Sequence, residues 1–365
     1  MDAPSPAAPL PALTDLPLDG WDALAAVPGA RSFTPRVVRR WVWEKGARDF
    51  DAMSDVSRPL REALAARFVV RHGRLEQEHE SSDGTLGLLT RLHDGQVIES
   101  VCIPEAERNT LCLSSQAGCA VRCRFCASGL DGLLRNLSAG EILEQVLVAR
   151  EARPEQPLTN YVFMGSGEPT HNLKAVIQAL RVMTSPDGLG IGARRITVST
   201  VGHPEALRHL AEVDIPFNLA LSVHMPGDAG REQLMPGLGP SDLAATLAAA
   251  LARFDANGRR LTIEVVVLAG INDREQDARD FARLLRGLPA AVNLIPWNPV
   301  DDLPLREPSP DRVRALAATL NRLGVTATIR RPRGQDVGVA CGQLQRRAET
   351  SSRAVGGAPL LRGPE

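Results

Sequence analysis

The sequence lacks any long hydrophobic run, and no stretch of its 365 residues approaches the length of a membrane span. Its start also lacks the basic and apolar regions of a secretory signal, and carries instead Asp2 and the prolines Pro4, Pro6, Pro9 and Pro11. Only six cysteines are present. Without a secretion signal, we expect these thiols to be reduced and to serve metal binding or catalysis. These absences predict a cytoplasmic enzyme with no membrane partner.

The chain has almost no net charge, because 42 Lys and Arg face 43 Asp and Glu. That balance argues by itself against a polyanionic partner. The charges are nevertheless unevenly placed: residues 31–75 hold eleven Lys or Arg against five acids, and residues 325–347 hold five Arg against one Asp. Basic side chains near Trp41, Trp43 and Phe50 suit phosphate contact and base stacking in RNA. A solvated helix face is the alternative explanation.

Three cysteines, Cys119, Cys123 and Cys126, follow the spacing CxxxCxxC. Iron–sulfur clusters are usually held by four Cys, so three thiolates suit a [4Fe-4S] cluster with one iron left for a substrate or cofactor. A structural zinc site with a fourth ligand from elsewhere is the alternative. The spacing favours the cluster, because closed zinc sites usually pair two short CxxC-like segments.

Beyond residue 104 the sequence alternates between apolar, β-rich runs and helical stretches. This pattern is typical of an α/β fold with a parallel sheet, either open or closed into a barrel. The expected strands are 110–113, 161–164, 195–199, 217–223, 262–268, 292–295 and 326–329. The expected helices lie near 138–152, 173–184, 204–213, 241–256, 275–286 and 309–323.

Composition and periodicity divide the chain into five parts. We expect a disordered Pro/Ala-rich N-terminus (1–20), a small basic helical domain whose charge suits RNA (21–75), a β-extension (76–104), the main α/β domain (105–345) and a flexible tail (346–365).

Glycine-rich or polar segments follow several expected strands, at the edge where α/β barrels carry their chemistry. One of them, Gly165-Ser166-Gly167-Glu168-Pro169, resembles the GGEP-type motif of radical S-adenosylmethionine (SAM) proteins. In those proteins the motif receives the amino group of SAM, and a carboxylate is physically suited to an ammonium group. The cysteine spacing likewise resembles the cluster loop of radical SAM enzymes.

Three further stretches resemble one family, the RlmN/Cfr radical SAM RNA methyltransferases. They are Thr110-Leu111-Cys112-Leu113-Ser114-Ser115-Gln116, Asn293-Leu294-Ile295-Pro296-Trp297-Asn298-Pro299 and Ala340-Cys341-Gly342-Gln343-Leu344. Residues 37–68 also resemble the helical accessory domain of that family, so the resemblance covers about residues 30–345. It implies a partial, open parallel β/α barrel of the radical SAM type.

The resemblance implies a role for each matching residue. Cys119, Cys123 and Cys126 would hold the cluster. Gly167, Glu168, Ser199, Ser222, Val223, His224 and Asn298 occupy the positions that line SAM in the family.

Three residues would perform the chemistry that the resemblance implies. Cys341 would accept a methyl group from one SAM, and a deoxyadenosyl radical from a second SAM would activate that S-methyl group for addition to an adenine ring carbon. Glu99 would remove the ring proton. Cys112 would attack the Cys341 sulfur and release the methylated RNA. Such a route suits a ring carbon that is not nucleophilic.

Taken singly, these residues have simpler explanations. Cys112 could be a strand core residue, Cys341 an inert thiol in a turn, Glu99 a solvated strand residue and His224 a core histidine. Cys102 has no role in the scheme and fits a small buried apolar residue. The joint presence of the other residues in the order of the family favours the catalytic interpretation.

The chain departs from the family pattern at three places. Ser166 stands where Met or Gly is usual, Met225 where Ala or Ser is usual, and Gly338 where the family usually carries an acid. Because Gly338 is close to Cys341 in sequence, it bears on the rate or the target of the reaction.

We therefore expect an RlmN-like enzyme that methylates carbon 2 of an adenosine in the peptidyl-transferase region of 23S ribosomal RNA, with the adenosine beside the tRNA anticodon as a second target. It would be a monomer, reduced by a donor such as flavodoxin or ferredoxin, and would use two SAM per turnover. The alternatives are a Cfr-like carbon-8 methyltransferase, another radical SAM RNA-modifying enzyme, and a zinc-stabilised RNA-binding protein.

Overall fold

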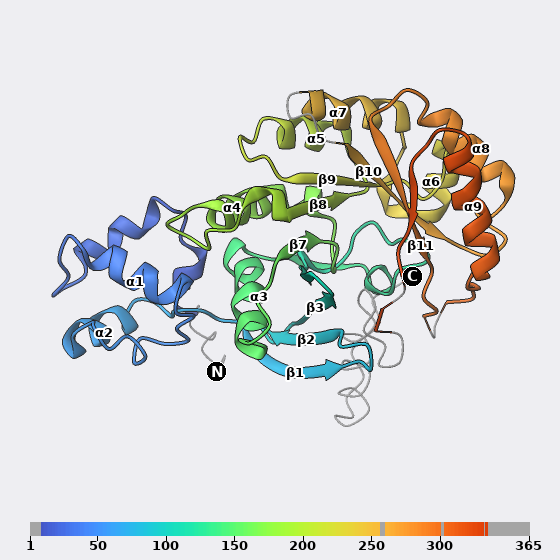
Figure 1. Cartoon of the computed structure of the whole chain (residues 1–365). Helices are drawn as coiled ribbons and strands as arrows, with labels where there is room; N and C mark the ends of the chain where they lie inside the picture. Colours follow the sequence, from blue (N-terminus) through green and yellow to red (C-terminus); the bar gives the residue numbers. More distant parts are fainter. Residues whose placement is uncertain (1–8, 256–259, 301–302, 332, 335–365) are drawn as a thin grey trace, which may run out of the picture.

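The computed structural model describes residues 9–255, 260–300, 303–331, 333 and 334. Its centre is a ten-stranded sheet with helices packed against it (Figure 1). The strands follow the order β1-β2-β3-β4-β7-β8-β9-β10-β11-β12, and β5 and β6 form a separate two-stranded hairpin. Their bounds are β1 Arg74–Glu80, β2 Leu86–Arg91, β3 Val97–Glu105, β4 Arg108–Cys112, β5 Gln116–Gly118, β6 Leu133–Asn136, β7 Asn160–Phe163, β8 Ile196–Thr200, β9 Asn218–Ser222, β10 Leu261–Val267, β11 Ala290–Pro296 and β12 Ala327–Ile329.

The large sheet is mixed. Strands β1 to β4 pair antiparallel, whereas β4 and β7 to β12 all pair parallel. Within the described residues β1 and β12 are the two edges, so the sheet is open, as predicted, and is not a closed barrel. The seven predicted strands are confirmed, with small shifts at their ends. The parallel strands are strongly apolar because helices cover them.

The helices that follow the strands also match the prediction. They are α3 Ala139–Ala152, α4 Leu173–Thr184, α5 Pro204–Ala211, α7 Leu243–Asp255, α8 Glu275–Leu284 and α9 Pro310–Arg322. A further helix, α6 Asp228–Leu234, was not predicted; it is short and follows the polar segment after β9. Short 3-10 helices complete this part: η3 Ala127–Gly129, η4 Pro169–Asn172, η5 Ala193–Arg195 and η6 Pro236–Leu238.

The N-terminal part contains η1 Leu13–Asp15, η2 Gly20–Ala26, α1 Thr34–Trp43 and α2 Arg58–Ala65. The prediction of disorder up to residue 20 is wrong for residues 9–20. Leu13 is fully buried, and Ala12 forms a parallel bridge with Val69. Apolar residues therefore attach this segment to the fold despite its many prolines.

The helices α1 and α2 lie at one end of the molecule, and α8 and α9 lie at the other (Figure 1). One large hydrophobic core nevertheless extends from Trp21 and Val38 near the N-terminus to Leu320 in α9. Cys102 lies in this core with 4% of its surface exposed, which fits the apolar role suggested for it. No helix in the described part of the chain is long and apolar enough to span a membrane.

Candidate active site

A cavity of about 270 Å³ opens at the carboxyl ends of the parallel strands. We call it the central cavity. Side chains from β3, β4 and β7 to β11 line it, together with the segments that follow β5, β7, β9, β11 and β12. Of the predicted site residues, it brings together Glu99, Cys112, Cys119, Cys123, Cys126, Gly167, Glu168, Ser199, Ser222, His224 and Asn298.

One predicted site residue that the structure describes, Val223, does not line the central cavity. Val223 is fully buried in the large core, and its backbone N–H donates to the Glu264 carbonyl at 3.0 Å. It can support the cavity through its backbone alone. Cys341 lies outside the described residues, as does Gly338.

The three clustered cysteines lie on a loop that is held tightly at both ends. The Cys119 N–H donates to the Gly132 carbonyl at 2.9 Å, and the Cys126 N–H donates to the Cys123 carbonyl at 3.1 Å. Gly118 has a φ of 74°, and a Cβ on it would lie only 2.0 Å from the Gly132 oxygen. Glycine is therefore required where β5 enters the loop.

Burial makes these thiols hard to ionise by themselves. It raises the pKa of Cys119 to about 12, and it raises the pKa of Cys123 and of Cys126 as well. For Cys123, the charges of Cys126 and Cys119 raise the pKa further. A positively charged group that binds all three thiolates would remove this penalty.

The donor set fits an iron–sulfur cluster. A single zinc ion needs its ligands to converge on one point about 2 Å from each donor. Among the described residues, no three His, Cys, Asp or Glu side chains are placed to hold a single metal ion. In a cluster each thiolate binds a different iron, so the thiols need not converge in this way.

The Glu168 carboxylate is oriented by four hydrogen bonds. Its Oε1 accepts from the backbone N–H of Thr170 at 2.9 Å and from the hydroxyls of Thr170 and Thr200, at 2.7 and 2.5 Å. Among the described residues its Oε2 accepts only from the Val201 N–H, at 2.9 Å, and a carboxylate oxygen has capacity for one more donor. The adjacent Gly167 has a φ of 105° and lies so close to Gln116 that a Cβ would clash with it at 2.6 Å.

Polar groups at the ends of β8 and β9 line the next part of the wall. The hydroxyls of Ser199 and Ser222 are 3.3 Å apart. The Nδ1 atom of His224 accepts a hydrogen bond from the Val266 N–H at 3.1 Å. Burial and the charge of Arg231 lower the pKa of His224 to about 3. The ring is therefore neutral, with its proton on Nε2, and it packs edge-on against Phe125.

Glu99 and Cys112 line the central cavity from the antiparallel strands. Glu99 is in β3 with 3% of its surface exposed, so it is not the solvated strand residue of the simpler explanation. Cys112 is in β4 opposite Val101 of β3 and packs against Leu89 and Val97. Its surroundings are apolar, yet it also faces the same cavity as the three clustered cysteines.

The sequence analysis missed Glu264 and Arg330, which also line the central cavity. Glu264 is 4% exposed and accepts a hydrogen bond from the Asn293 side chain at 2.8 Å. Burial raises its pKa. A glutamate inside the otherwise apolar run of β10 was a signal that could have identified it. Arg330, Arg331 and Arg333 follow β12 and line the same cavity.

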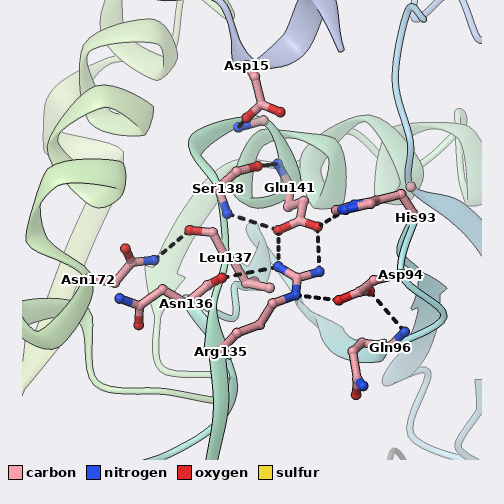
Figure 2. A network of polar contacts seen from close by, with 12 residues as sticks. Asp15, His93, Asp94, Gln96, Arg135, Asn136, Leu137, Ser138, Glu141 and Asn172 are labelled. Carbon is pink, nitrogen blue, oxygen red and sulfur yellow. Dashed lines mark hydrogen bonds and ion pairs between the residues drawn. The ribbon is translucent and has the colours of Figure 1, made fainter. Parts of the chain in front are cut away.

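An ion-pair network is centred on Arg135 of β6 (Figure 2). Arg135 of β6 binds both carboxylate oxygens of Glu141 in α3, at 2.7 and 2.8 Å, and contacts Asp94 at 2.5 Å. Asp94 precedes β3, which carries Glu99. The network therefore joins β6, which pairs with β5 next to the loop of the three cysteines, to α3 and to the turn before β3.

The N-terminal aromatic residues do not have the role that the sequence suggested. Trp43 and Phe50 are buried, at 2% and 6% exposed, so they cannot stack on bases. Trp41 donates a hydrogen bond to Asp55, and the Lys45 ammonium lies over its ring. The exposed aromatic residue of this region is Phe33, with 49% of its surface exposed.

Comparison with known proteins identifies two matching family models. Residues 113–282 match the radical SAM superfamily, and residues 12–70 match the N-terminal domain of ribosomal RNA large subunit methyltransferases. The two matches account for most of the described chain.

Individual relatives match nearly the whole chain. A dual-specificity RNA methyltransferase RlmN from an Anaeromyxobacter species is 45% identical over 350 residues, which cover 94% of this chain and 92% of the relative. A probable RlmN from Rhodopirellula baltica is 44% identical and covers 87% of this chain and 86% of its own length. The crystal structure of a radical SAM methyltransferase from Sphaerobacter thermophilus superimposes with a TM-score of 0.88 at 40% identity, covering 92% of this chain and 99% of the other.

Proposed function

The chain belongs to the RlmN family of radical SAM RNA methyltransferases, and we propose that it methylates carbon 2 of an adenine in RNA. Its proposed targets are an adenosine in the peptidyl-transferase region of 23S ribosomal RNA and the adenosine beside the tRNA anticodon. One observation carries the proposal: the three clustered thiols line the same cavity as an acid and a further thiol, Glu99 and Cys112. That combination suits covalent chemistry on a ring carbon.

The residues of one wall would bind the cofactors. Cys119, Cys123 and Cys126 would hold a [4Fe-4S] cluster, and Glu168 would accept the SAM ammonium at its less occupied oxygen, Oε2. Ser199, Ser222, Asn298 and the Nε2–H of His224 would orient the rest of SAM. When bound, the cluster and SAM supply the methyl group and the one-electron chemistry that an unreactive ring carbon requires.

Three other residues, Cys341, Glu99 and Cys112, would act on the RNA. Cys341 would carry the methyl group as S-methylcysteine and form the covalent link to the adenine. Glu99, which lines the cavity, would remove the ring proton once that link exists. The Cys112 thiolate would then attack the Cys341 sulfur, which forms a disulfide and releases the methylated RNA.

Several partners and conditions belong to the same proposal. Residues 21–75 would be the RNA-binding accessory domain, two SAM would be used in each turnover, and flavodoxin or ferredoxin would supply the electron. The protein would act as a monomer in the cytoplasm. Arg122 and Arg124 of the cluster loop are exposed and form no ion pair within the described residues, which suits the approach of an acidic electron carrier.

Product analysis tests the target atom. The anaerobically reconstituted protein is incubated with SAM, a reductant and either 23S ribosomal RNA or tRNA, and the RNA is digested to nucleosides for mass spectrometry. We expect 2-methyladenosine, and no methylation by the Cys119→Ala variant. A product that coelutes with 8-methyladenosine would show a Cfr-like specificity instead.

A further inference from the structure

Arg231 is a fully buried cation in α6, the helix that the sequence analysis did not predict. Its guanidinium donates to the carbonyl of Val201 at 2.6 Å, and more weakly to those of Ser222 and Val223, at 3.5 and 3.4 Å. It also donates to the Ser241 hydroxyl at 3.1 Å, and among the described residues it forms no ion pair. A buried charge is costly unless such bonds compensate it, so these acceptors hold the guanidinium in one place.

Val201 connects this guanidinium to Glu168, the proposed acceptor of the SAM ammonium group. Val201 follows β8, and its backbone N–H donates to the Oε2 atom of Glu168 at 2.9 Å. Thr200, the last residue of β8, donates its hydroxyl to Oε1 at 2.5 Å. Two of the four hydrogen bonds that orient the carboxylate therefore come from residues 200–201, whose position depends on the bond between Arg231 and the Val201 carbonyl.

Ser222 connects the same guanidinium to the neighbouring strand. Its carbonyl, at the end of β9, lies 3.5 Å from the Nη1 atom of Arg231, whereas its hydroxyl lies 3.3 Å from the Ser199 hydroxyl. Both hydroxyls belong to residues that line the central cavity, and Arg231 itself does not line it. A planar guanidinium with several N–H donors in a fixed arrangement can hold the ends of β8 and β9 together, which a single ammonium group does less well.

We propose that Arg231 is a positioning residue that holds residues 200–201 where they orient the Glu168 carboxylate toward the ammonium group of SAM. The inference rests on the proposed function, because it requires SAM to bind at Glu168. Without the guanidinium, the Val201 carbonyl loses its partner, and the hydrogen bonds from residues 200–201 to Glu168 weaken. Affinity should then fall mainly for ligands that carry the ammonium group, because only they use this carboxylate.

Ligand binding without turnover tests this proposal. Anaerobically reconstituted wild type, Arg231→Met and Arg231→Lys are titrated calorimetrically with S-adenosylhomocysteine, which has no methyl group to transfer, and with its analogue that lacks the α-amino group. We expect wild type to bind S-adenosylhomocysteine more tightly than the analogue. In Arg231→Met this preference should fall about tenfold, through weaker binding of S-adenosylhomocysteine. Arg231→Lys keeps the charge but not the planar donor arrangement, so it should lose part of the preference, and it tests the proposal even if Arg231→Met does not fold.

Asn272→Ala is the matched control. Asn272 is also fully buried, and its side chain donates to the backbone carbonyls of His224 and Val266, both at 2.8 Å. Its hydrogen bonds among the described residues do not involve the segment after β8. Its loss should therefore weaken the binding of both ligands by the same factor and leave the preference unchanged.

The preference compares two ligands on the same protein, so a smaller folded or cluster-loaded fraction does not alter it. Equal losses of affinity for the two ligands in the Arg231 variants would overturn the proposal, and so would unchanged affinities. A wild type that binds both ligands equally would instead contradict the ammonium site at Glu168, and with it the proposed function as well as this inference.

Discussion

Hydrogen-bond donors around Glu168 stabilise its negative charge inside the central cavity. A buried carboxylate is costly unless donors surround it, and here one backbone N–H and two hydroxyls point at Oε1 while one backbone N–H points at Oε2. His224 shows the opposite case, because burial keeps its ring neutral. Its φ of 60° is rare for a residue with a side chain and places the ring at the cavity. The cavity thus combines a fixed negative charge with a neutral donor.

Cys112 and Cys341, the two cysteines of the proposed mechanism outside the CxxxCxxC segment, allow a prediction about single residues. Cys112→Ala should still allow methyl loading of Cys341 and addition to the RNA, but it removes the thiolate that resolves the link. Turnover should stop after about one RNA per enzyme, with a covalent protein–RNA species. A denaturing gel would show it as an upward shift that nuclease removes.

Two variants serve as controls for that experiment. Cys102→Ala removes a buried thiol of the large core and should give no shift. The double variant Cys112→Ala/Cys341→Ala should lose the shift, because the link depends on Cys341. Free methylated RNA from Cys112→Ala at the wild-type rate would refute the assigned role of Cys112.

Sequence reasoning finds residues whose chemistry is concentrated in a motif. The three clustered cysteines and Glu168 stand in short, distinctive segments, and the structure places them around one cavity. Ser128 also lines this cavity but has no such signal, because a serine in a loop is common and only the fold brings it to Ser166. Trp43 was misjudged for the same reason. A tryptophan near arginines can be core or surface, and packing alone decides.

Helix α3 is the element that holds the site together, because three of its buried polar residues bind three different parts of the chain. Glu141 binds Arg135 of β6, the strand that pairs with β5 (Figure 2). Gln145 exchanges two hydrogen bonds with the backbone of Ser114, at 2.8 and 2.9 Å. Glu144 accepts from the Thr14 hydroxyl and from the backbone before β1. The sequence predicts this helix, but polar residues usually indicate an exposed face, so the burial of these three side chains could not be predicted from it.

The raised pKa of Glu144 predicts that the free energy of unfolding depends on pH. Burial raises its pKa from an ordinary 4.5 to about 7, although three donors oppose the rise. The folded state therefore keeps a proton that the unfolded state has already released. The resulting stabilisation is present at low pH and is lost as the pH rises through 7. Relative to wild type, Glu144→Gln should gain about 2.5 kcal/mol of unfolding free energy between pH 5 and pH 8.

Urea unfolding of both proteins at several pH values measures this difference. Glu205→Gln removes an exposed glutamate from α5 and serves as the control for a change in net charge. A constant difference between Glu144→Gln and wild type from pH 5 to pH 8 would mean that Glu144 is ionised throughout. The three donors would then outweigh burial.

At the scale of the whole molecule, many N-terminal arginines are already paired within the fold. Ion pairs join Arg39 to Asp187, Arg40 to Asp55, Arg58 to Glu62, and both Arg48 and Arg71 to Glu151. Charge counts along the sequence cannot show this, because some of the partners come from α3 and from the loop after α4. The basic surface available to RNA is therefore smaller than the sequence suggests.

Arg31 and Arg36 remain as exposed cations around Phe33, and neither forms an ion pair within the described residues. If this group contacts RNA, each arginine that neutralises a phosphate contributes about 0.7 to 0.9 to the slope of log affinity against log salt. Arg31→Ala/Arg36→Ala should weaken RNA binding and flatten that slope by about 1.5. Phe33→Ala should weaken binding with an unchanged slope, because stacking releases no counterions.

Arg279→Ala/Arg283→Ala removes the same charge from α8, at the other end of the molecule (Figure 1), and should change neither quantity. Equal salt slopes for the two double variants would show that the N-terminal arginines only cover a solvated surface.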